Sequence, residues 1–288
     1  MAIHPTALVD PAAEVCSNVE IGPFAVIEPG VLLADGCRVG ARATIKTGSA
    51  IGANTVIGEG AVIGGLPQHL NAPPENGRVS IGADNVIREH VTIHRAMHAD
   101  GVTRIGDSCL LMVGTHVAHD CSVGHHVILT NNVLLGGHVV VQDRACLGGA
   151  AAVHQNCRVG RLAMVAATAK VVKDVPPYVL TSETAEVVGL NKVGLRRAGI
   201  DRTEVEQLKA AYQVIYRQGL AFKDMLAALQ NEFPAGIAAD YSLFFGEGKR
   251  GFVQERRSPP TVAIKLHPAV NAEEGEAAKP HFPRRLAG

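Results

Sequence analysis

Aliphatic side chains recur at every sixth position of this 288-residue chain over long stretches. The repeated position holds Ile, Leu or Val from Ile3 to Ile63, from Ile81 to Ile93 and from Ile105 to Val171. A period of six matches neither the period of about 3.6 of an α-helix nor the turn spacing of roughly 8–12 residues in hairpin sheets. It predicts an all-β solenoid in which each short strand ends at a tight corner and points one apolar side chain into a shared core. Three hexads complete a three-sided coil of about 18 residues, so the 26 counted hexads make between eight and nine coils.

The repeat is interrupted twice. His69, Glu75 and Ala99 stand where the apolar residue belongs, and these failures mark excursions over about residues 64–80 and 94–104. Long excursions from a regular scaffold usually carry function. We therefore expect both segments to contribute functional or assembly contacts.

The hexads stop at residues 175–178 (Val-Pro-Pro-Tyr), where proline removes the backbone donors that a further strand needs. Beyond them, apolar residues at helical spacing predict helices over about 203–218 and 222–229, with a third beginning near Tyr241. The capping-box spacing of Thr203 and Glu206 predicts the start of the first of these helices.

The composition therefore predicts three segments. Residues 1–180 form the solenoid, residues 181–253 form a small helical domain that caps one end of it, and residues 254–288, rich in Pro, Glu and Ala, form a disordered tail. A solenoid of this length leaves a flank exposed, and self-association is a common way to cover it.

Charge and composition exclude several classes of protein. The 27 basic and 27 acidic residues balance, so no net field draws nucleic acid or a membrane surface to the chain. No apolar run approaches the roughly 18 residues of a membrane span, and no signal-peptide pattern is visible, so we expect a cytoplasmic protein without stable membrane insertion. Four of the six cysteines stand two positions before a core slot, where small unoxidised thiols pack well: Cys37, Cys109, Cys121 and Cys157.

Histidines gather on one side of the predicted prism. The hexads that begin at Val117, Leu135 and Val153 are 18 residues apart and therefore stack in successive coils. Four histidines in or just before these hexads avoid the inward slots and therefore line one outer edge: His116, His119, His138 and His154. Such an edge suits a metal site or acid–base catalysis, and a solvated stripe without a role is the alternative. Asp120 follows His119 as a possible orienting carboxylate, or as a group that satisfies corner backbone donors.

These residues also carry a family likeness. From about residue 1 to 253 the chain resembles the UDP-N-acetylglucosamine acyltransferases that begin lipid A synthesis. The motifs that carry the resemblance are Ile93-His94-Arg95, residues 115–121 (Thr-His-Val-Ala-His-Asp-Cys), Asn131-Asn132, Gly136-Gly137-His138, Val153-His154-Gln155 and residues 174–178 (Asp-Val-Pro-Pro-Tyr). Hexads alone are shared by many acyl- and acetyltransferases, whereas the His-x-x-His-Asp-Cys stretch is much more specific.

The resemblance implies a left-handed parallel β-helix with C-terminal helices, assembled as a homotrimer with active sites in the clefts between subunits. It implies transfer of an R-3-hydroxyacyl chain to the glucosamine 3-hydroxyl of a UDP-sugar. The donor is the phosphopantetheine thioester of acyl carrier protein, and neither a bound cofactor nor a metal is implied.

Individual roles follow from the same motifs. His119 matches the general base, Asp120 its orienting partner, and the backbone N–H of Gly137 the donor to the oxyanion. Ala167 matches a position that controls acyl-chain length. Substrate-binding positions are matched by Gln68, His94, His116, His138, His154, Gln155, Asn191 and Arg197. A basic cluster near the end of the solenoid is expected to dock the acidic carrier protein: Arg158, Arg161, Lys170, Lys173, Arg196 and Arg197.

The chain departs from the family pattern at Asn71, where the family has Lys, and at Val193, where it has Glu. The family's Arg-Arg pair aligns with Arg197-Ala198. These departures leave open a UDP-sugar with a 3-amino group, which would give an N-acyl product.

Two other classes remain open. One is a zinc enzyme like the γ-carbonic anhydrases, although the spacing of His116, His119 and His138 differs from theirs. The other is a non-catalytic scaffold, which would leave the histidine edge unexplained.

Overall fold

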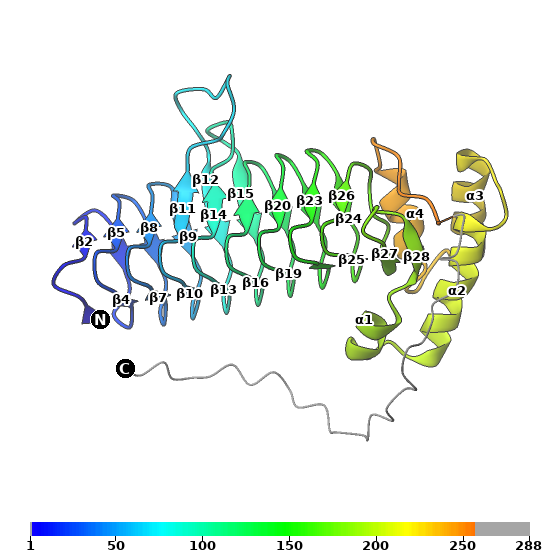
Figure 1. Cartoon of the computed structure of the whole chain (residues 1–288), viewed down its shortest axis with the longest axis horizontal. Coiled ribbons are helices and arrows are strands. Elements are labelled where there is room, and N and C mark those ends of the chain that lie inside the picture. Colours follow the sequence, from blue (N-terminus) through cyan, green and yellow to red (C-terminus); the bar gives the residue numbers. More distant parts are fainter. Residues whose placement is uncertain (1, 257–288) are drawn as a thin grey trace. The chain divides into compact units, whose positions relative to one another are not determined.

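The computed structural model describes residues 2–256; Met1 and residues 257–288 lie outside the described residues. The chain winds as a long three-sided coil and ends in a cluster of helices (Figure 1). Successive strands fall on three faces in turn, and each pairs in parallel with the strand one coil later. The 26 strands β1–β26 equal the number of hexads counted in the sequence.

Three sheets form the faces of the coil, here named sheets A, B and C. Sheet A has 11 strands, in the order β1 (Ala2–Ile3), β4 (Glu20–Ile21), β7 (Arg38–Val39), β10 (Val56–Ile57), β13 (Val86–Ile87), β16 (Leu110–Leu111), β19 (Ile128–Leu129), β22 (Cys146–Leu147), β25 (Met164–Val165), β27 (Val179–Thr181) and β28 (Val187–Leu190).

Sheet B has nine strands, in the order β2 (Leu8–Val9), β5 (Val26–Ile27), β8 (Thr44–Ile45), β11 (Val62–Gly65), β14 (Thr92–His94), β17 (His116–Val117), β20 (Leu134–Leu135), β23 (Ala152–Val153) and β26 (Lys170–Val171). Sheet C has eight strands, namely β3 (Glu14–Val15), β6 (Leu32–Leu33), β9 (Ser49–Ile51), β12 (Arg78–Ile81), β15 (Val102–Ile105), β18 (Ser122–Val123), β21 (Val140–Val141) and β24 (Arg158–Val159).

The register of these sheets stacks equivalent positions of the hexad on top of one another. In sheet B, Val117 pairs with Leu135, and Leu135 pairs with Val153. All three side chains are at most 3% exposed. Each such column removes aliphatic side chains from water at about 25 cal/mol per Å² of apolar surface, so the period of six is the direct sequence record of this core. The four cysteines expected in small core slots are buried free thiols, as predicted.

Corners place particular side chains on the outside of the coil. The third residue after many inward slots adopts a left-handed backbone, with φ of 59° at Asp120, 58° at His138 and 62° at Asn156. Asp, Asn and His are enriched among the non-glycine residues that tolerate this conformation. The corner between sheets B and C therefore presents a regular ladder of polar side chains.

Both predicted excursions are present and leave the coil at this same corner. They comprise residues 66–77, between β11 and β12, and residues 95–101, between β14 and β15, where Figure 1 shows loops projecting from the prism. The backbone N–H of Gly77 donates to the carbonyl of Ala96 at 2.9 Å, which packs one excursion against the other. The first excursion lies two coils before the coil that carries His119, and the second lies one coil before it.

The C-terminal helices are α1 (Lys192–Arg197), α2 (Arg202–Tyr216), α3 (Phe222–Glu232) and α4 (Ala239–Gly246). The predicted cap of α2 was wrong by two residues, because Asp201 and Glu204 form the capping box instead of Thr203 and Glu206. The helix α1 was missed, because six residues are too few to show a period.

The disordered tail predicted from residue 254 begins at least three residues too early. Gln254 and Arg256 hydrogen-bond to the backbone of Val187, and the Glu255 carboxylate accepts hydrogen bonds from Tyr212 and Arg217. The rest of the predicted tail lies outside the described residues.

A buried ion pair joins the helices to the solenoid. The Arg158 guanidinium donates to Asp174 Oδ2 at 2.8 Å and to the carbonyl of Phe244 at 2.7 Å. It also lies over the Phe244 ring, 4.1 Å from its centroid. Arg158 therefore does not belong to the predicted docking surface for a carrier protein, since its charge is already used inside the fold.

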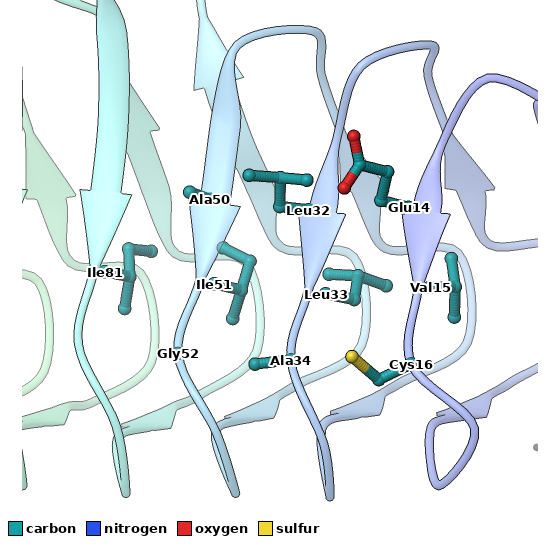
Figure 2. Close-up of a pocket in the computed structure, with 10 residues that line it drawn as sticks. All are labelled: Glu14, Val15, Cys16, Leu32, Leu33, Ala34, Ala50, Ile51, Gly52 and Ile81. Atoms are coloured by element: carbon teal, nitrogen blue, oxygen red, sulfur yellow. The ribbon is translucent and has the colours of Figure 1, made fainter.

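A groove of about 540 Å³ lies on sheet C near the N-terminal end (Figure 2). Its walls are mainly aliphatic, and Glu14 is the one ionised side chain among the residues that line it. The groove lies away from the corner that carries the predicted histidine edge. Its aliphatic lining offers few groups for acid–base chemistry, so the candidate active site is described at the histidine corner. None of the helices in residues 2–256 has the length and apolar character needed to cross a bilayer.

Candidate active site

The centre of the candidate site is a histidine–carboxylate pair at the corner after β17. His119 Nδ1 lies 2.8 Å from Asp120 Oδ2, and the two side chains are 10% and 17% exposed. A carboxylate only accepts hydrogen bonds, so the imidazole proton belongs on Nδ1 and the lone pair on Nε2. This is the tautomer that a general base requires.

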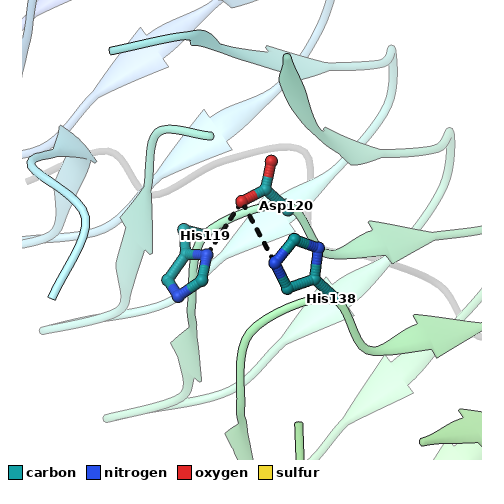
Figure 3. A group of neighbouring side chains, drawn as sticks. All are labelled: His119, Asp120 and His138. Atoms are coloured by element: carbon teal, nitrogen blue, oxygen red, sulfur yellow. Dashed lines mark hydrogen bonds and ion pairs between the residues drawn. The ribbon is translucent and has the colours of Figure 1, made fainter. Parts of the chain in front are cut away.

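Asp120 is itself held from three directions, through its carboxylate and its backbone. Its Oδ2 also accepts the backbone N–H of Met97 at 3.1 Å, from the second excursion. The backbone N–H of Asp120 donates to Thr103 Oγ1 at 2.8 Å. On the far side, His138 Nε2 stands 3.7 Å from the same Oδ2 (Figure 3). The second excursion thus contributes directly to the position of the pair.

One coil later, Gly137 stacks directly on His119. A Cβ atom at residue 137 would lie 2.5 Å from His119 Cε1 and 2.7 Å from Nε2. Glycine is therefore needed here to leave His119 Nε2 uncovered, although Gly137 is not among the residues with positive φ. No residue in the described range 2–256 accepts the backbone N–H of Gly137, so this N–H is available to a ligand.

A second pair of histidines adjoins the first. The rings of His94 and His116 are 5.0 Å apart. His116 Nδ1 lies 2.8 Å from Thr92 Oγ1, and His94 Nδ1 lies 2.6 Å from the carbonyl oxygen of Leu66. Burial lowers the pKa of His116 to about 4, and burial also lowers the pKa of His94. Both rings are therefore neutral near pH 7 and act as hydrogen-bonding groups. Among the histidines at this corner, His119 is the one whose ring lies at hydrogen-bonding distance from a carboxylate.

The sequence missed His69 as a member of the site. Its ring meets the ring of His119 edge to face, with centroids 5.9 Å apart. His69 Nδ1 accepts the backbone N–H of Asn71 at 3.1 Å, which leaves the ring proton on Nε2. The available signal was that His69 breaks the apolar slot inside an excursion. Gln68, which was predicted, is its exposed neighbour in the same loop.

Other predicted residues lie near this corner or away from it. His154 and Gln155 are exposed at the same corner one coil beyond Gly137. Asn191 caps α1, since its Oδ1 accepts from the Gly194 N–H at 3.0 Å and its Nδ2 donates to the Leu162 carbonyl at 2.9 Å. Arg197 is exposed in the last turn of α1.

Ala167 lies at the corner after β25, on the opposite side of sheet B from the histidine corner. Within one chain, Ala167, Asn191 and Arg197 are thus remote from His119. They belong to the C-terminal end of the coil and to α1, whereas His119 lies near the middle of the coil.

The alternative of a zinc enzyme would need His116, His119 and His138 to meet at one point, and they do not. His116 is turned to Thr92 and His94. The residues in the described range whose ligand atoms cluster are instead His119, Asp120 and His138, all within 4.8 Å of one another.

The coil is that of a hexapeptide-repeat transferase, and the histidine–carboxylate pair lies on one of its corners. The family model for bacterial transferase hexapeptides matches residues 12–47 and 103–137. The model for the second domain of UDP-N-acetylglucosamine O-acyltransferase matches residues 174–253.

Curated relatives narrow this class. The chain is 40% identical over 258 residues to an acyl-[acyl-carrier-protein]–UDP-N-acetylglucosamine O-acyltransferase of Syntrophobacter fumaroxidans, covering 88% of this chain and all of the relative. It is 41% identical over 234 residues to the enzyme of the same name from Thermodesulfovibrio yellowstonii, covering 81% of this chain and 91% of the relative. The chain belongs to the UDP-N-acetylglucosamine O-acyltransferase family.

Solved structures agree. The UDP-N-acetylglucosamine O-acyltransferase of Moraxella catarrhalis superposes with a TM-score of 0.83 at 34% identity, over 88% of this chain and all of the other. The UDP-N-acetylglucosamine acyltransferase of Francisella novicida gives 0.85 at 34% identity, over 88% and 95%. The predicted fold, a left-handed parallel β-helix with C-terminal helices, is confirmed.

Proposed function

We propose that this chain transfers an R-3-hydroxyacyl group from acyl carrier protein to the 3-position of UDP-N-acetylglucosamine, the first step of lipid A synthesis. The observation that carries the proposal is the His119–Asp120 pair beneath the bare backbone of Gly137. Curated relatives that match most of the chain bear the name of this activity.

The geometry supports a direct transfer. His119 Nε2 removes the proton of the sugar 3-hydroxyl as its oxygen attacks the thioester carbonyl carbon. The unpaired N–H of Gly137 donates to the oxygen that becomes negative. The C–S bond then breaks, and the imidazolium returns its proton to the departing phosphopantetheine thiolate. Asp120 keeps the ring oriented and stabilises its charged form, and a positioned base of this kind contributes roughly 10²–10⁴-fold to the rate.

The remaining polar groups suit the sugar nucleotide. Neutral His94 and His116, half-exposed His138 and the exposed Gln68, His154 and Gln155 offer donors and acceptors around the base. Asn191 and Arg197 are assigned to the UDP end, where a guanidinium suits a diphosphate. The distance between these two residues and His119 in one chain supports a homotrimer in which a neighbouring copy completes the site.

Apolar side chains on the outer faces support the same assembly. Leu134 on sheet B is 48% exposed, and Ile128 on sheet A is 37% exposed. Outward-facing aliphatic groups on two neighbouring faces of one coil are the kind of surface that an interface between copies covers.

The carrier protein is expected to dock on the exposed basic groups that remain after Arg158 is removed from the cluster. These are Arg161, Lys170, Lys173, Arg196 and Arg197. The donor is a thioester of acyl carrier protein, and no further cofactor is assigned. Because such donors are found in the cytoplasm, a cytoplasmic location is part of this proposal. A Lys173→Glu variant should raise KM for the carrier at low salt, with the difference shrinking as ionic strength rises. An unchanged KM would refute the docking surface.

Acyl transfer should be measured with UDP-N-acetylglucosamine and its 3-amino counterpart, using hydroxyacyl carrier proteins of several lengths. We expect His119→Ala to lose most of the activity. The matched control is His125→Ala, because His125 also pairs with an aspartate, Asp107, at 3.1 Å but on an exposed corner between other sheets. Full activity of His119→Ala would refute the base, and preference for the 3-amino sugar would replace the ester product by an amide.

A further inference from the structure

Three metal-capable side chains converge in the candidate site. One ligand atom each of His119, Asp120 and His138 lies within 4.8 Å of the other two. Figure 3 shows both imidazoles directed at the same carboxylate oxygen. We propose that this cluster binds one Zn²⁺ ion reversibly, and that the bound ion inhibits the enzyme.

Two of the three ligand-atom separations are close to those of a tetrahedral zinc site. Zinc takes histidine nitrogen at about 2.0–2.1 Å and carboxylate oxygen at about 2.0–2.2 Å, so that ligand atoms lie roughly 3.4 Å apart. The two contacts to Asp120 Oδ2, 2.8 Å from His119 Nδ1 and 3.7 Å from His138 Nε2, fall on either side of that separation. His138 is 52% exposed, so its ring is free to turn, and water takes the fourth position.

The backbone already holds the three ligands in place. The N–H of His138 donates to the carbonyl of His119 at 3.0 Å, which ties the two coils together beside the cluster. The hydrogen bonds from Met97 to the Asp120 carboxylate and from the Asp120 N–H to Thr103 fix the acidic ligand. Supporting hydrogen bonds of this kind typically change metal affinity about 10–100-fold.

The consequence for catalysis follows from the tautomer of His119. An ion that binds His119 Nδ1 displaces the proton that is now hydrogen-bonded to Asp120. In the neutral His119 ring, that proton is then carried by Nε2. The nitrogen that must take the sugar proton then has no lone pair, so the base is lost without any group entering the sugar site. This inhibitory part rests on the proposed function, whereas the binding part does not. It is the opposite of a zinc hydrolase, in which the metal activates a water molecule.

Binding is tested with chelator-treated full-length protein and zinc chloride alone, by isothermal titration calorimetry at neutral pH. We expect one Zn²⁺ per chain in the wild type and at least about tenfold weaker binding in His138→Gln. The control is His125→Gln, because the His125–Asp107 pair has no third ligand grouped with it among the described residues. Wild-type protein that binds no zinc, or equal affinity in His138→Gln, would overturn the proposal.

Inhibition is tested separately in the acyl-transfer assay. Transfer should fall in proportion to zinc occupancy and return when a chelator is added. Zinc that binds at the cluster but leaves transfer unchanged, or that increases it, overturns the inhibitory part. A chain that binds zinc as expected but transfers no acyl group even without the metal refutes the proposed function and leaves the binding site standing.

Discussion

Replacing Gly137 by alanine adds one methyl group directly beside His119, the proposed base. The new Cβ would lie 2.5 Å from Cε1 and 2.7 Å from Nε2 of His119, so the imidazole has to move. The backbone at residue 137 is in a region that alanine adopts, and the Gly137 N–H is kept. The substitution therefore tests the position of His119 apart from the oxyanion donor.

The expected loss follows from what His119 contributes. Displacing the ring breaks the 2.8 Å hydrogen bond to Asp120 and removes the base from the line of attack, which costs roughly 10²–10⁴ in kcat, or about 2.7–5.4 kcal/mol of transition-state free energy. The fold loses one hydrogen bond to a charged group, about 1.5–3 kcal/mol, so the melting temperature should fall by no more than roughly 10 °C.

The assay is steady-state acyl transfer at saturating donor and sugar, with calorimetry on the same preparations. Gly149→Ala is the matched control, because Gly149 is also the second glycine of a Gly-Gly corner but its Cβ would meet nothing closer than 3.6 Å. We expect its kcat to stay within about twofold of wild type. If Gly137→Ala kept more than half of the wild-type kcat, the assignment of His119 as base beneath Gly137 would be wrong.

Three further predictions concern stability and specificity. Because folding lowers the pKa of His116 to about 4, its stabilising contribution is present above pH 6.5 and is lost as pH falls toward 4. Between pH 7 and pH 5, the free energy of unfolding of His116→Gln should therefore fall by about 1–2 kcal/mol less than that of the wild type. Urea titrations at the two pH values that give equal losses for both proteins would contradict this. Arg158→Ala leaves the Asp174 carboxylate buried without its partner, at 3% exposure, and should lower the free energy of unfolding by about 3–5 kcal/mol. A melting temperature within about 2 °C of wild type corresponds to a loss of about 1 kcal/mol or less. That result would show that the ion pair does not hold the helices to the solenoid. Ala167→Met should shorten the preferred acyl chain, and an unchanged chain-length profile of the purified variant would reject that role.

The sequence by itself determined the prism and the ladder on its corner. A side chain at a fixed offset from an inward aliphatic slot must reappear one coil later at the same place, so the positions of His119, Gly137 and Gln155 on one edge follow from counting alone. The two excursions were visible as broken slots for the same reason. Short-range periodicity is enough here because each coil repeats the hydrogen-bonding pattern of the coil before it.

Only the tertiary structure decided which groups meet at that corner and which are already committed. His69 reaches His119, and the Met97 N–H reaches Asp120, because two irregular loops pack on each other through contacts between residues far apart in the chain. Arg158 resembled its basic neighbours in sequence, yet a buried carboxylate and a helix carbonyl take up its charge. A repeat fixes where a side chain starts, but loop conformation and partner choice depend on long-range packing, which no local pattern encodes.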